Sequence, residues 1–413
     1  MPRWPQYGRL GALKDHPDTA PLLMRTAHAN CRHPEAVAQL YQGLLPQTAP
    51  PTNHPATDLE LVLLFVSPQG DIARIAAAAH KQFAPVPVIG CSTAGEISQN
   101  GYGDGGIVAI GFPKSHFIAR CTLIEDLDIT EAQPALDRII QNRHQMALAT
   151  PSWESEFAFL MVDGLSRSED ALTAKLAAGL GPVPLFGGSA GDGDAFEHTS
   201  VLFDGAVFEN AAVLAQIRSN CPIKVFKTDN LTPTETRMVV TAADPGQRLV
   251  HEINAEPAAR ELARILGKDP DQLSTFTFAA HPLLVRLGDQ HHVRAIQRVT
   301  PDGSLVFFSA IDAGMVLALA DQQDMVVHLE QEMQGLSAQG APDMVLACDC
   351  LLRRIDAEQK QQATAVSRIL SANRVFGFST YGEQVNSMHV NQTLTGVAIY
   401  PPSVRDTAGI GKA

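Results

Sequence analysis

Hydrophobic residues along this chain gather into short continuous runs, and each run is followed by a segment with apolar residues at helical spacing. The run Leu61–Val66 ends at a Ser-Pro pair, which predicts a strand that is buried on both faces. Residues 71–83 then carry Ile and Ala at helical spacing, and Val86–Ile89 forms a second apolar run. The pattern predicts a strand, a helix and a second strand, then a turn rich in Gly and Ser, and a further strand at Ile107–Phe112.

The same order of elements occurs twice more. The second copy comprises Phe157–Val162, residues 169–180 and Val183–Phe186, and the third comprises Met344–Leu351, residues 357–370 and Val375–Phe376. Each second run leads into a Gly- and Ser-rich turn that ends in an acid, at residues 90–96, 187–192 and 377–383. The copies are too widely spaced for a solenoid. We therefore predict an α/β fold with mixed β-sheets flanked by helices, in two domains that share this repeated unit.

Polar and Pro-rich segments indicate where the domains begin and end. Residues 1–35 show no periodicity and predict a loose leader, and residues 403–413 predict a flexible tail. Between them we expect one domain over residues 36–222 and a second over 223–402. The second domain contains a region unlike the repeats, with a predicted helix at Glu256–Leu266, strand-like runs at Thr275–Leu287, His292–Val299 and Leu305–Ala310, and a hairpin turn at residues 301–304.

Composition narrows the class of protein. The 413 residues carry a formal net charge of -13 without a stripe of Lys and Arg, which argues against nucleic acid or an anionic membrane as the main partner. The apolar runs are too short to cross a bilayer, and the first residues contain no apolar segment typical of a secretory signal. The six cysteines show no C-x-x-C spacing. We therefore expect a cytoplasmic protein with free thiols.

The three Gly- and Ser-rich turns are the most chemically varied segments of the chain. Such a turn offers backbone N–H groups, hydroxyls and a carboxylate, which either hold a polar ligand or satisfy the local backbone. Because equivalent strand ends converge in an α/β fold, three copies favour at least one ligand site. We expect the third turn to be its main wall, since alternation places His389, Asn391 and Thr393 on one strand face. The candidate ligand-binding residues are Ser92, Thr93, Ser189, Asp192, Ser379, Thr380, Tyr381, Glu383, Asn391 and Thr393.

One of these turns also matches a catalytic motif. Residues 187–191 fit the G-x-S-x-G pattern of the α/β-hydrolase nucleophile elbow, with Ser189 as the nucleophile. The elbow needs a helix directly after this serine, and the following Asp-Gly-Asp disfavours one. The other two turns have the spacing G-x-S-x-x-G, which an elbow does not tolerate. We therefore do not expect an enzyme, and a serine hydrolase that uses Ser189 is the alternative from another functional class.

Taken in order, the turns and their flanks make the chain resemble the FIST family of bacterial sensory proteins. The matching segments are Val88–Glu96, Leu185–Asp192, Leu202–Gly205, Asp349–Arg354, Phe376–Glu383 and His389–Ala398. The likeness extends over roughly residues 36–400, which the family divides into FIST-N and FIST-C halves. The third turn together with residues 389–393 is most similar to the branch that includes the nitric-oxide-sensing haem proteins.

The resemblance implies a sensor that binds haem b and nitric oxide. Such a sensor regulates a partner histidine kinase or a cyclic-di-GMP enzyme, which is a diguanylate cyclase or a phosphodiesterase. Other family members are thought to sense small molecules without haem, so a sensor of an amino acid or another small metabolite is the alternative. A haem sensor usually needs a neutral axial histidine. His389 is the first candidate for the haem iron, because it closely follows the third turn, and His281, which we expect to open a strand, is the second.

Overall fold

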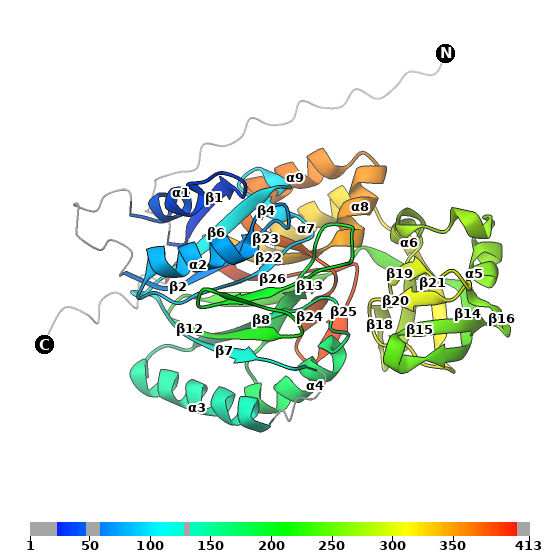
Figure 1. Ribbon diagram of the computed structural model, residues 1–413, viewed down its shortest axis with the longest axis horizontal. Helices are drawn as coiled ribbons and strands as arrows, with labels where there is room; N and C mark the ends of the chain where they lie inside the picture. The colour runs from blue at the N-terminus through cyan, green and yellow to red at the C-terminus, as the bar shows by residue number, and fades with distance from the viewer. Residues whose placement is uncertain (1–22, 47–57, 128–132, 403–413) are drawn as a thin grey trace, which may run out of the picture.

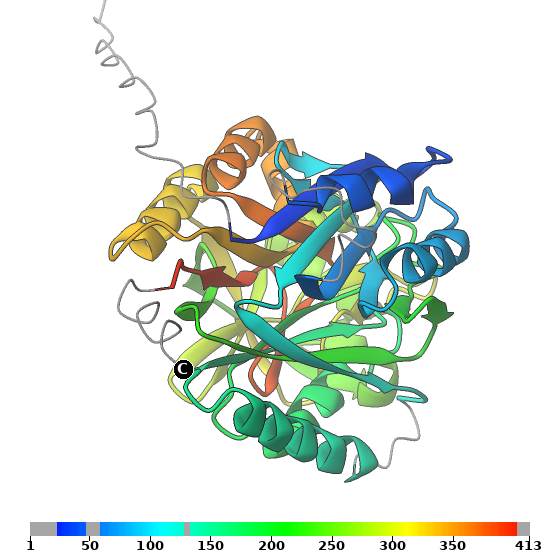
Figure 2. The ribbon, with the colours of Figure 1, turned by 90° about the vertical axis from the view of Figure 1, so that its left-hand side faces the viewer.

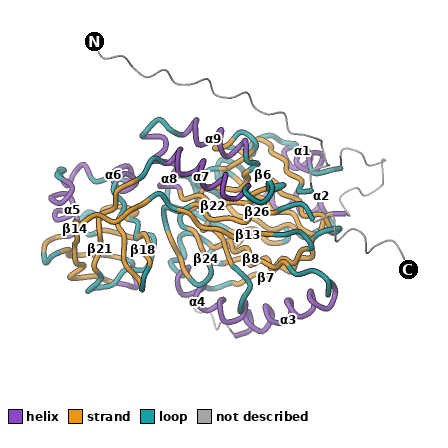
Figure 3. Tube along the Cα trace, turned by 180° about the vertical axis from the view of Figure 1, so that it is seen from behind, coloured by secondary structure: helices purple, strands orange, loops and turns teal. Residues whose placement is uncertain are grey.

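The computed structural model describes residues 23–46, 58–127 and 133–402. Three six-stranded sheets form a large body, and a fourth sheet forms a smaller lobe beside it (Figure 1). Helices cover the outer faces of the three sheets in the body, and the strands lie inside them (Figure 3). The fold is therefore the predicted α/β arrangement of mixed sheets flanked by helices. Within the described ranges, no helix is both long and apolar enough to cross a membrane.

Each repeat of the chain supplies four strands of one sheet in the body, by the same plan. A unit has an edge strand, a helix, two parallel strands joined by further helix, a hairpin and a closing strand. The first unit comprises β1 (Arg25–Asn30), α1 (Ala36–Gly43), β2 (Leu59–Val66), α2 (Ile72–Phe83), β3 (Val88–Ser92), β4 (Glu96–Ser98), β5 (Gly101–Gly103) and β6 (Gly106–Pro113). The second comprises β7 (Phe117–Ile124), α3 (Gln133–Ala149), β8 (Ser155–Val162), α4 (Glu169–Leu180), β9 (Leu185–Ser189), β10 (Val201–Phe203), β11 (Ala206–Phe208) and β12 (Ala212–Ser219).

The third unit follows the same plan but carries a long insertion. It comprises β13 (Ile223–Thr228), α7 (Met325–Ser337), β22 (Met344–Cys350), α8 (Leu351–Gln359), α9 (Ala363–Ala372), β23 (Val375–Thr380), β24 (Glu383–Val385), β25 (Met388–Val390) and β26 (Leu394–Ile399). The insertion lies between β13 and α7. Figure 2 shows the helices of the three units as separate groups around the sheets, blue for the first, teal for the second and orange for the third.

The hairpin that precedes the closing strand of each unit pairs with the sheet of another unit. The hairpin β4–β5 of the first unit joins β23 of the third, β24–β25 of the third joins β9 of the second, and β10–β11 of the second joins β3 of the first. The three sheets therefore share one strand order, β1-β6-β2-β3-β10-β11, β7-β12-β8-β9-β24-β25 and β13-β26-β22-β23-β4-β5. This cyclic exchange closes after three units and gives the body an approximate threefold arrangement.

One hydrophobic core lies between the three sheets. Alternate residues of β2, β8 and β22 face this core, and the residues between them pack against the helices outside. Phe65 shows the contact between units, because its ring stacks on Phe378 with centroids 4.6 Å apart and meets Phe159 edge-on at 6.2 Å. Burial on both faces explains why these strands have continuous apolar runs rather than alternating ones.

The insertion, residues 231–322, is called here the inserted lobe. Its strands are β14 (Leu231–Asp244), β15 (Leu249–Ile253), β16 (Glu256–Pro257), β17 (Leu283–Leu287), β18 (Gln290–Val293), β19 (Ile296–Val299), β20 (Leu305–Phe307) and β21 (Val316–Gln322). The helices α5 (Ala258–Leu266) and α6 (Thr275–Ala280) accompany them. The strands run in the order β18-β17-β21-β14-β15-β20-β19, and β16 pairs with β15. The antiparallel pairing of β19 with β20 confirms the hairpin expected at residues 301–304.

Three local predictions from the sequence are wrong. Residues 25–30 are not part of a loose leader, since β1 pairs with β6 along its whole length, whereas residues 1–22 and the expected tail lie outside the described residues. The expected single helix over 357–370 is divided, and Gln361 between its two parts has a φ of 56°. The expected strand at residue 275 is helix α6, because a short apolar run does not distinguish a strand from a buried helical turn.

Candidate functional site

The three Gly- and Ser-rich turns meet in the body, at the carboxyl ends of β3, β9 and β23. Their backbones hydrogen-bond to one another in a ring, in which the serine carbonyl of each turn accepts from the next turn. Ser92 accepts from the N–H of Gly191 at 3.1 Å, Ser189 accepts from the third turn at 3.3 Å, and Ser379 accepts from the first at 2.9 Å. The turns therefore converge as equivalent strand ends predict.

The first glycine of every turn is required by packing. A Cβ atom at Gly90, Gly187 or Gly377 would lie within 3.0 Å of a backbone carbonyl oxygen of the neighbouring parallel strand. Backbone atoms cannot move aside cheaply, so only glycine fits where the two strands approach so closely. This repeated feature of the sequence is therefore explained by the contact between strands.

The Thr and Glu residues of the first and third turns bind each other. Thr93 donates to Glu96 at 2.6 Å, and Thr380 donates to Glu383. Glu96 also accepts the backbone N–H of the first residue of β6 at 2.9 Å, and Glu383 accepts that of the residue just before β26 at 3.2 Å. Burial raises the pKa of Glu96 to about 7 and that of Glu383 to about 8, while the threonine hydrogen bonds oppose this rise. These two carboxyl groups thus serve mainly to close the units.

Asp192 ends the second turn and organises the loop that follows it. Its carboxylate accepts the backbone N–H groups of Phe196, Glu197 and His198 at 2.9, 2.8 and 2.8 Å, and it accepts the hydroxyl of Tyr381. Burial alone would raise the pKa of Asp192, but the hydrogen bond from Tyr381 and those from the backbone lower it below its ordinary value. Asp192 and Tyr381 therefore join the second turn to the third.

His389 and Asn391 lie against Gly382 of the third turn. A Cβ atom at Gly382 would lie 2.7 Å from His389 Nε2 and 2.7 Å from Asn391 Nδ2. His389 is buried, its Nδ1 lies 3.2 Å from Nε2 of Gln384, and its own Nε2 has no hydrogen-bond partner among the residues described. Burial lowers the pKa of His389, so its ring is neutral near pH 7.

His389, Asn391 and Thr393 were expected to share one face of a strand, but they do not lie on a single strand. The strand that carries His389 ends at Val390, and Asn391 and Thr393 lie in the turn before β26. The side chain of Asn391 nevertheless donates to the carbonyl of Tyr381 at 3.2 Å, and that of Thr393 donates to a third-turn carboxyl group at 2.7 Å. Their contact with the turn thus arises from loop geometry rather than from strand alternation.

Ser189 lacks the surroundings of a hydrolase nucleophile. It is fully buried, and the residues that follow it form a loop and the hairpin β10–β11 rather than a helix. Its hydroxyl donates to Glu169 at 3.4 Å and accepts from Gln384 Nε2 at 2.9 Å. Gln384 also bonds His389, so an amide separates the serine from the nearest histidine ring. This geometry does not support the serine hydrolase alternative.

A pair of acids at the start of α4 connects the body to the inserted lobe. Glu169 and Asp170 both accept from Nη2 of Arg248, at 2.7 and 3.0 Å, and Arg248 also donates to the carbonyl of Phe308 within the lobe. Arg248 is only 5% exposed. The residues that meet here are called the polar cluster, and they are Glu169, Asp170, Ser189, Arg248, Arg294, Gln384, His389 and Asn391.

Arg294 contributes a second guanidinium to the polar cluster from the lobe side. It is 6% exposed, and its Nη1 donates to the carbonyl of Val293 at 3.2 Å. Its Nε is buried without a partner, and Arg294 forms no ion pair with any part of the chain that the structure describes. Burial lowers the pKa of Arg294; the charge of Asp170 opposes this shift and that of Arg248 adds to it. Arg294 is therefore a buried cation close to other charges but paired with none.

Aromatic rings pack next to the polar cluster. Phe196 of the second unit, Tyr381 of the third turn and Phe308 of the inserted lobe contact one another, with ring centroids 4.7 to 5.9 Å apart. These rings seal the contact between body and lobe, and they belong to a hydrophobic group that includes Val293 and Ala295 on either side of Arg294. The polar cluster thus lies where three distant parts of the chain meet.

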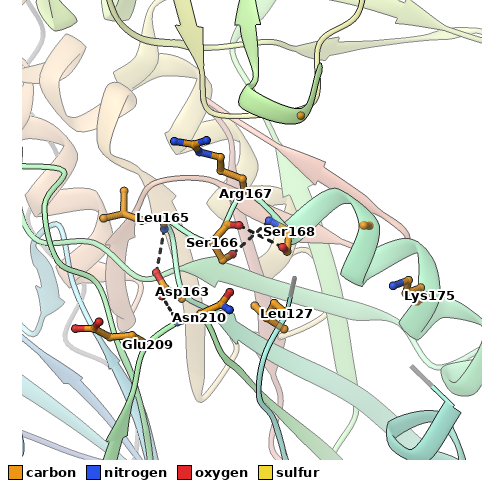
Figure 4. A pocket seen from close by; sticks show the side chains of 11 residues that line it. Leu127, Asp163, Leu165, Ser166, Arg167, Ser168, Lys175, Glu209 and Asn210 are labelled. Carbon is orange, nitrogen blue, oxygen red and sulfur yellow. Dashed lines mark hydrogen bonds between the residues drawn. The ribbon is translucent and has the colours of Figure 1, made fainter. Parts of the chain in front are cut away.

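A cavity of about 660 Å³ lies beside the segment that leads into α4 and the first turns of that helix (Figure 4). It is lined by Asp163, Arg167 and Lys175 from the body and by Gly246 from the inserted lobe. Arg167 points from the body toward the lobe, and its backbone carbonyl accepts from Arg248 at 2.9 Å. The cavity and the polar cluster therefore share the segment that holds the lobe against the body.

The remaining candidates lie apart from this cluster. His281 caps the end of α6 rather than opening a strand, and it is partly exposed. Burial lowers the pKa of His281, and the charges that act on it are those of Lys268, Asp356 and Lys360. Over the part of the chain described, no group of three or more His, Cys, Asp and Glu side chains could hold a metal ion. Ser92 and Thr93 are buried within the first turn.

Sequence reasoning missed the charged half of the polar cluster. Glu169, Asp170, Arg248 and Arg294 belong to no motif, and up to 125 positions separate them along the chain (294 − 169 = 125). Once the fold is known, Glu169 differs from an ordinary surface residue, because it is buried at the start of a helix, where an acid normally faces solvent. No local pattern in the sequence could have identified this group.

Comparisons with known proteins agree with the fold and the repeated turns. A model described as the FIST N domain matches residues 60–256, and one described as the FIST C domain matches residues 258–386. A search of curated proteins finds no match. The two models meet inside the inserted lobe, between β16 and α5, whereas our division at residues 222 and 223 stays a prediction. The chain therefore belongs to the FIST-domain proteins, whose domains are sensory modules that bind small ligands in signal transduction.

Proposed function

We propose that this protein senses a small polar ligand in the polar cluster, without haem, and passes the signal to a partner protein. The observation that carries the proposal is the set of unsatisfied polar atoms gathered there. Arg294 Nε, His389 Nε2, Asn391 Oδ1 and Gln384 Oε1 are all buried without hydrogen-bond partners among the residues described. Buried polar atoms in proteins are normally paired, so several unpaired ones in one place favour a site that a ligand completes.

Haem b, which the family resemblance implies, does not fit this arrangement. His389 has the chemistry of an axial ligand, because it is neutral and buried with a free Nε2. However, the ring edge that carries this nitrogen packs against Gly382, where a Cβ atom would lie 2.3 Å from Cε1 and 2.7 Å from Nε2 of His389. The backbone of the third turn thus occupies the side on which an iron atom and a porphyrin would have to lie. His281 is partly exposed among charged side chains, which is not the apolar shell that haem requires.

The position of the site suggests how binding is transmitted. A ligand in the polar cluster would contact both the body and the inserted lobe, so it would favour the arrangement in which the lobe is docked. A partner protein that contacts both parts can detect that change. A histidine kinase or a cyclic-di-GMP enzyme, expected from the family resemblance, stays the predicted partner.

Two measurements test this proposal. In the first, the purified protein is incubated with haem, and we expect no Soret band that shifts with nitric oxide. A shifting Soret band that is lost in His389→Ala would overturn the proposal in favour of the haem sensor.

The second measurement is a thermal-shift screen with small polar metabolites. We expect at least one compound to raise the Tm of the wild type and of Gly103→Ala, because a Cβ atom at Gly103 meets nothing within 4 Å. The same compound should not stabilise Gly382→Ala, whose methyl group would overlap His389 and Asn391 and displace both side chains. A screen in which no compound stabilises the wild type, or in which Gly382→Ala responds as the wild type does, contradicts the proposal.

A further inference from the structure

The charges of the polar cluster do not pair off. The cluster contains two carboxylates and two guanidinium groups, but both carboxylates bind the same guanidinium, that of Arg248. Asp170 is committed further, because its Oδ2 also accepts the backbone N–H of Ala310 at 3.1 Å. Among the residues that the structure describes, Arg294 is therefore left with one backbone carbonyl as its hydrogen-bond partner.

An unpaired buried guanidinium is costly to keep. Arginine does not lose its proton in proteins, so Arg294 cannot avoid the cost of burial by becoming neutral. Removing a charge from water without a counter-charge strongly destabilises a folded protein. An anion that binds this guanidinium would therefore stabilise the folded protein. The guanidinium plane is shaped to bind both oxygens of a carboxylate at once.

We propose that the ligand is a small hydroxycarboxylate whose carboxylate binds Arg294. This inference rests on the proposed function and specifies the ligand of the same site. The unpartnered atoms on the body side include two amide oxygens, Asn391 Oδ1 and Gln384 Oε1, which accept hydrogen bonds. A ligand hydroxyl supplies the donor that these acceptors lack. The ligand is thus an anion at its lobe end and a hydrogen-bond donor at its body end.

The surrounding charges favour a single negative charge on the ligand. His389 is neutral, and the two carboxylates offset the two guanidinium groups, so the cluster as a whole has no net charge. A monocarboxylate adds one negative charge next to Arg294. A phosphate dianion would add more charge beside Glu169 and Asp170, which repel it.

The test compares glycolate and lactate with their uncharged amides, glycolamide and lactamide, by calorimetric titration and by the shift in Tm. We expect the two carboxylates to bind and stabilise the wild type, and the amides to bind far more weakly. Arg294→Met should weaken carboxylate binding roughly 30-fold or more. Because this variant removes an unpaired charge, the Tm of the free protein should stay the same or rise. The matched variant Arg248→Met removes a paired charge, and its Tm should fall.

The other possible results separate a failure of the carboxylate inference from a failure of the proposed function. Equal binding of carboxylates and amides, or unchanged binding by Arg294→Met, overturns the carboxylate inference. A fall in the Tm of free Arg294→Met comparable to that of Arg248→Met also overturns it, because Arg294 would then be structural. If the metabolite screen yields an uncharged ligand that Gly382→Ala rejects, this inference fails while the proposed function stands. If nothing in that screen binds, the proposed function itself fails.

Discussion

Glu96 and Glu383 occupy the same place in the first and third units, and both hold a proton more tightly than an ordinary glutamate. Their pKa values are about 7 and about 8 in the fold, against an ordinary value of 4.5. At pH values between the unfolded pKa and the folded pKa, the folded state therefore binds more protons than the unfolded state. Their contribution to stability is complete below the unfolded pKa and is lost as pH rises toward the folded values.

The expected pH dependence follows from this difference. Between about pH 5 and about pH 7, each glutamate should lower the free energy of unfolding by roughly 1.4 kcal/mol per pH unit. Urea unfolding at several pH values should show that Glu96→Gln and Glu383→Gln each flatten the slope, because an amide has no proton to lose. The exposed Glu330→Gln serves as the control and should keep the wild-type slope. A wild-type slope in both buried variants would show that these carboxyl groups are ionised in the fold.

Residues of the third turn and the segment after it could be predicted as one group because they lie close together in the sequence. Ser379, Tyr381, Glu383 and His389 are within eleven positions (389 − 379 + 1 = 11), and the structure brings them together. The charged partners of the polar cluster come from segments far apart, and their pairing depends on where the inserted lobe docks. The sequence alone therefore does not show that these charged residues lie close together in the fold.

At the scale of elements, the close approach of the two parallel strands in each unit is the constraint with the clearest test. Gly187→Ala places a methyl group against a backbone oxygen of β8, so it should lower the free energy of unfolding by about 1–3 kcal/mol or more. Gly335 lies within α7, and a Cβ atom there meets nothing within 4 Å. Gly335→Ala should therefore raise the free energy of unfolding by roughly 0.5–1 kcal/mol. Chemical denaturation measures both, and equal effects of the two variants would contradict the packing argument.

Central strands were predictable from sequence, and edge strands were not. The strands β2, β8 and β22 are buried on both faces, which leaves a continuous apolar run in the sequence. The edge strands β1 and β13 bury only a few residues and have no such run. The start of α8 was assigned to a strand because its first residues are apolar. In the structure, a buried ion pair between Asp349 and Arg353, 2.8 Å apart, accompanies that first turn.

For the whole molecule, the docking of the inserted lobe depends on a buried ion pair. Arg248→Met leaves Glu169 buried without its partner, so it should lower the free energy of unfolding by roughly 3–5 kcal/mol. The double variant Glu169→Met with Arg248→Met should recover part of this loss, since the more deeply buried of the two carboxylates is then absent and only Asp170 is left without Arg248. Urea unfolding gives all the values of this double-mutant cycle.

The control is the ion pair of Arg286 with Asp289, in which the arginine side chain is 67% exposed and the carboxylate is fully exposed. Arg286→Met should leave the free energy of unfolding almost unchanged, because exposed ion pairs contribute little to stability. Limited proteolysis should also cleave Arg248→Met faster than the wild type at the junctions of the lobe. If the double variant is as unstable as Arg248→Met alone, the loss does not come from the orphaned charge of Glu169.

The exchange of hairpins among the units also determines when a newly made chain can fold. As the ribosome releases the first unit, its hairpin has no partner strand, because β23 lies about 280 positions further on (377 − 97 = 280). The sheet of the second unit likewise lacks its last two strands until the third unit emerges. Pairings over such long separations make folding slow, and unfinished sheets expose strand edges that aggregate. Until the third unit has been made, the sheet of the second unit therefore stays incomplete and the hairpin β4–β5 stays unpaired.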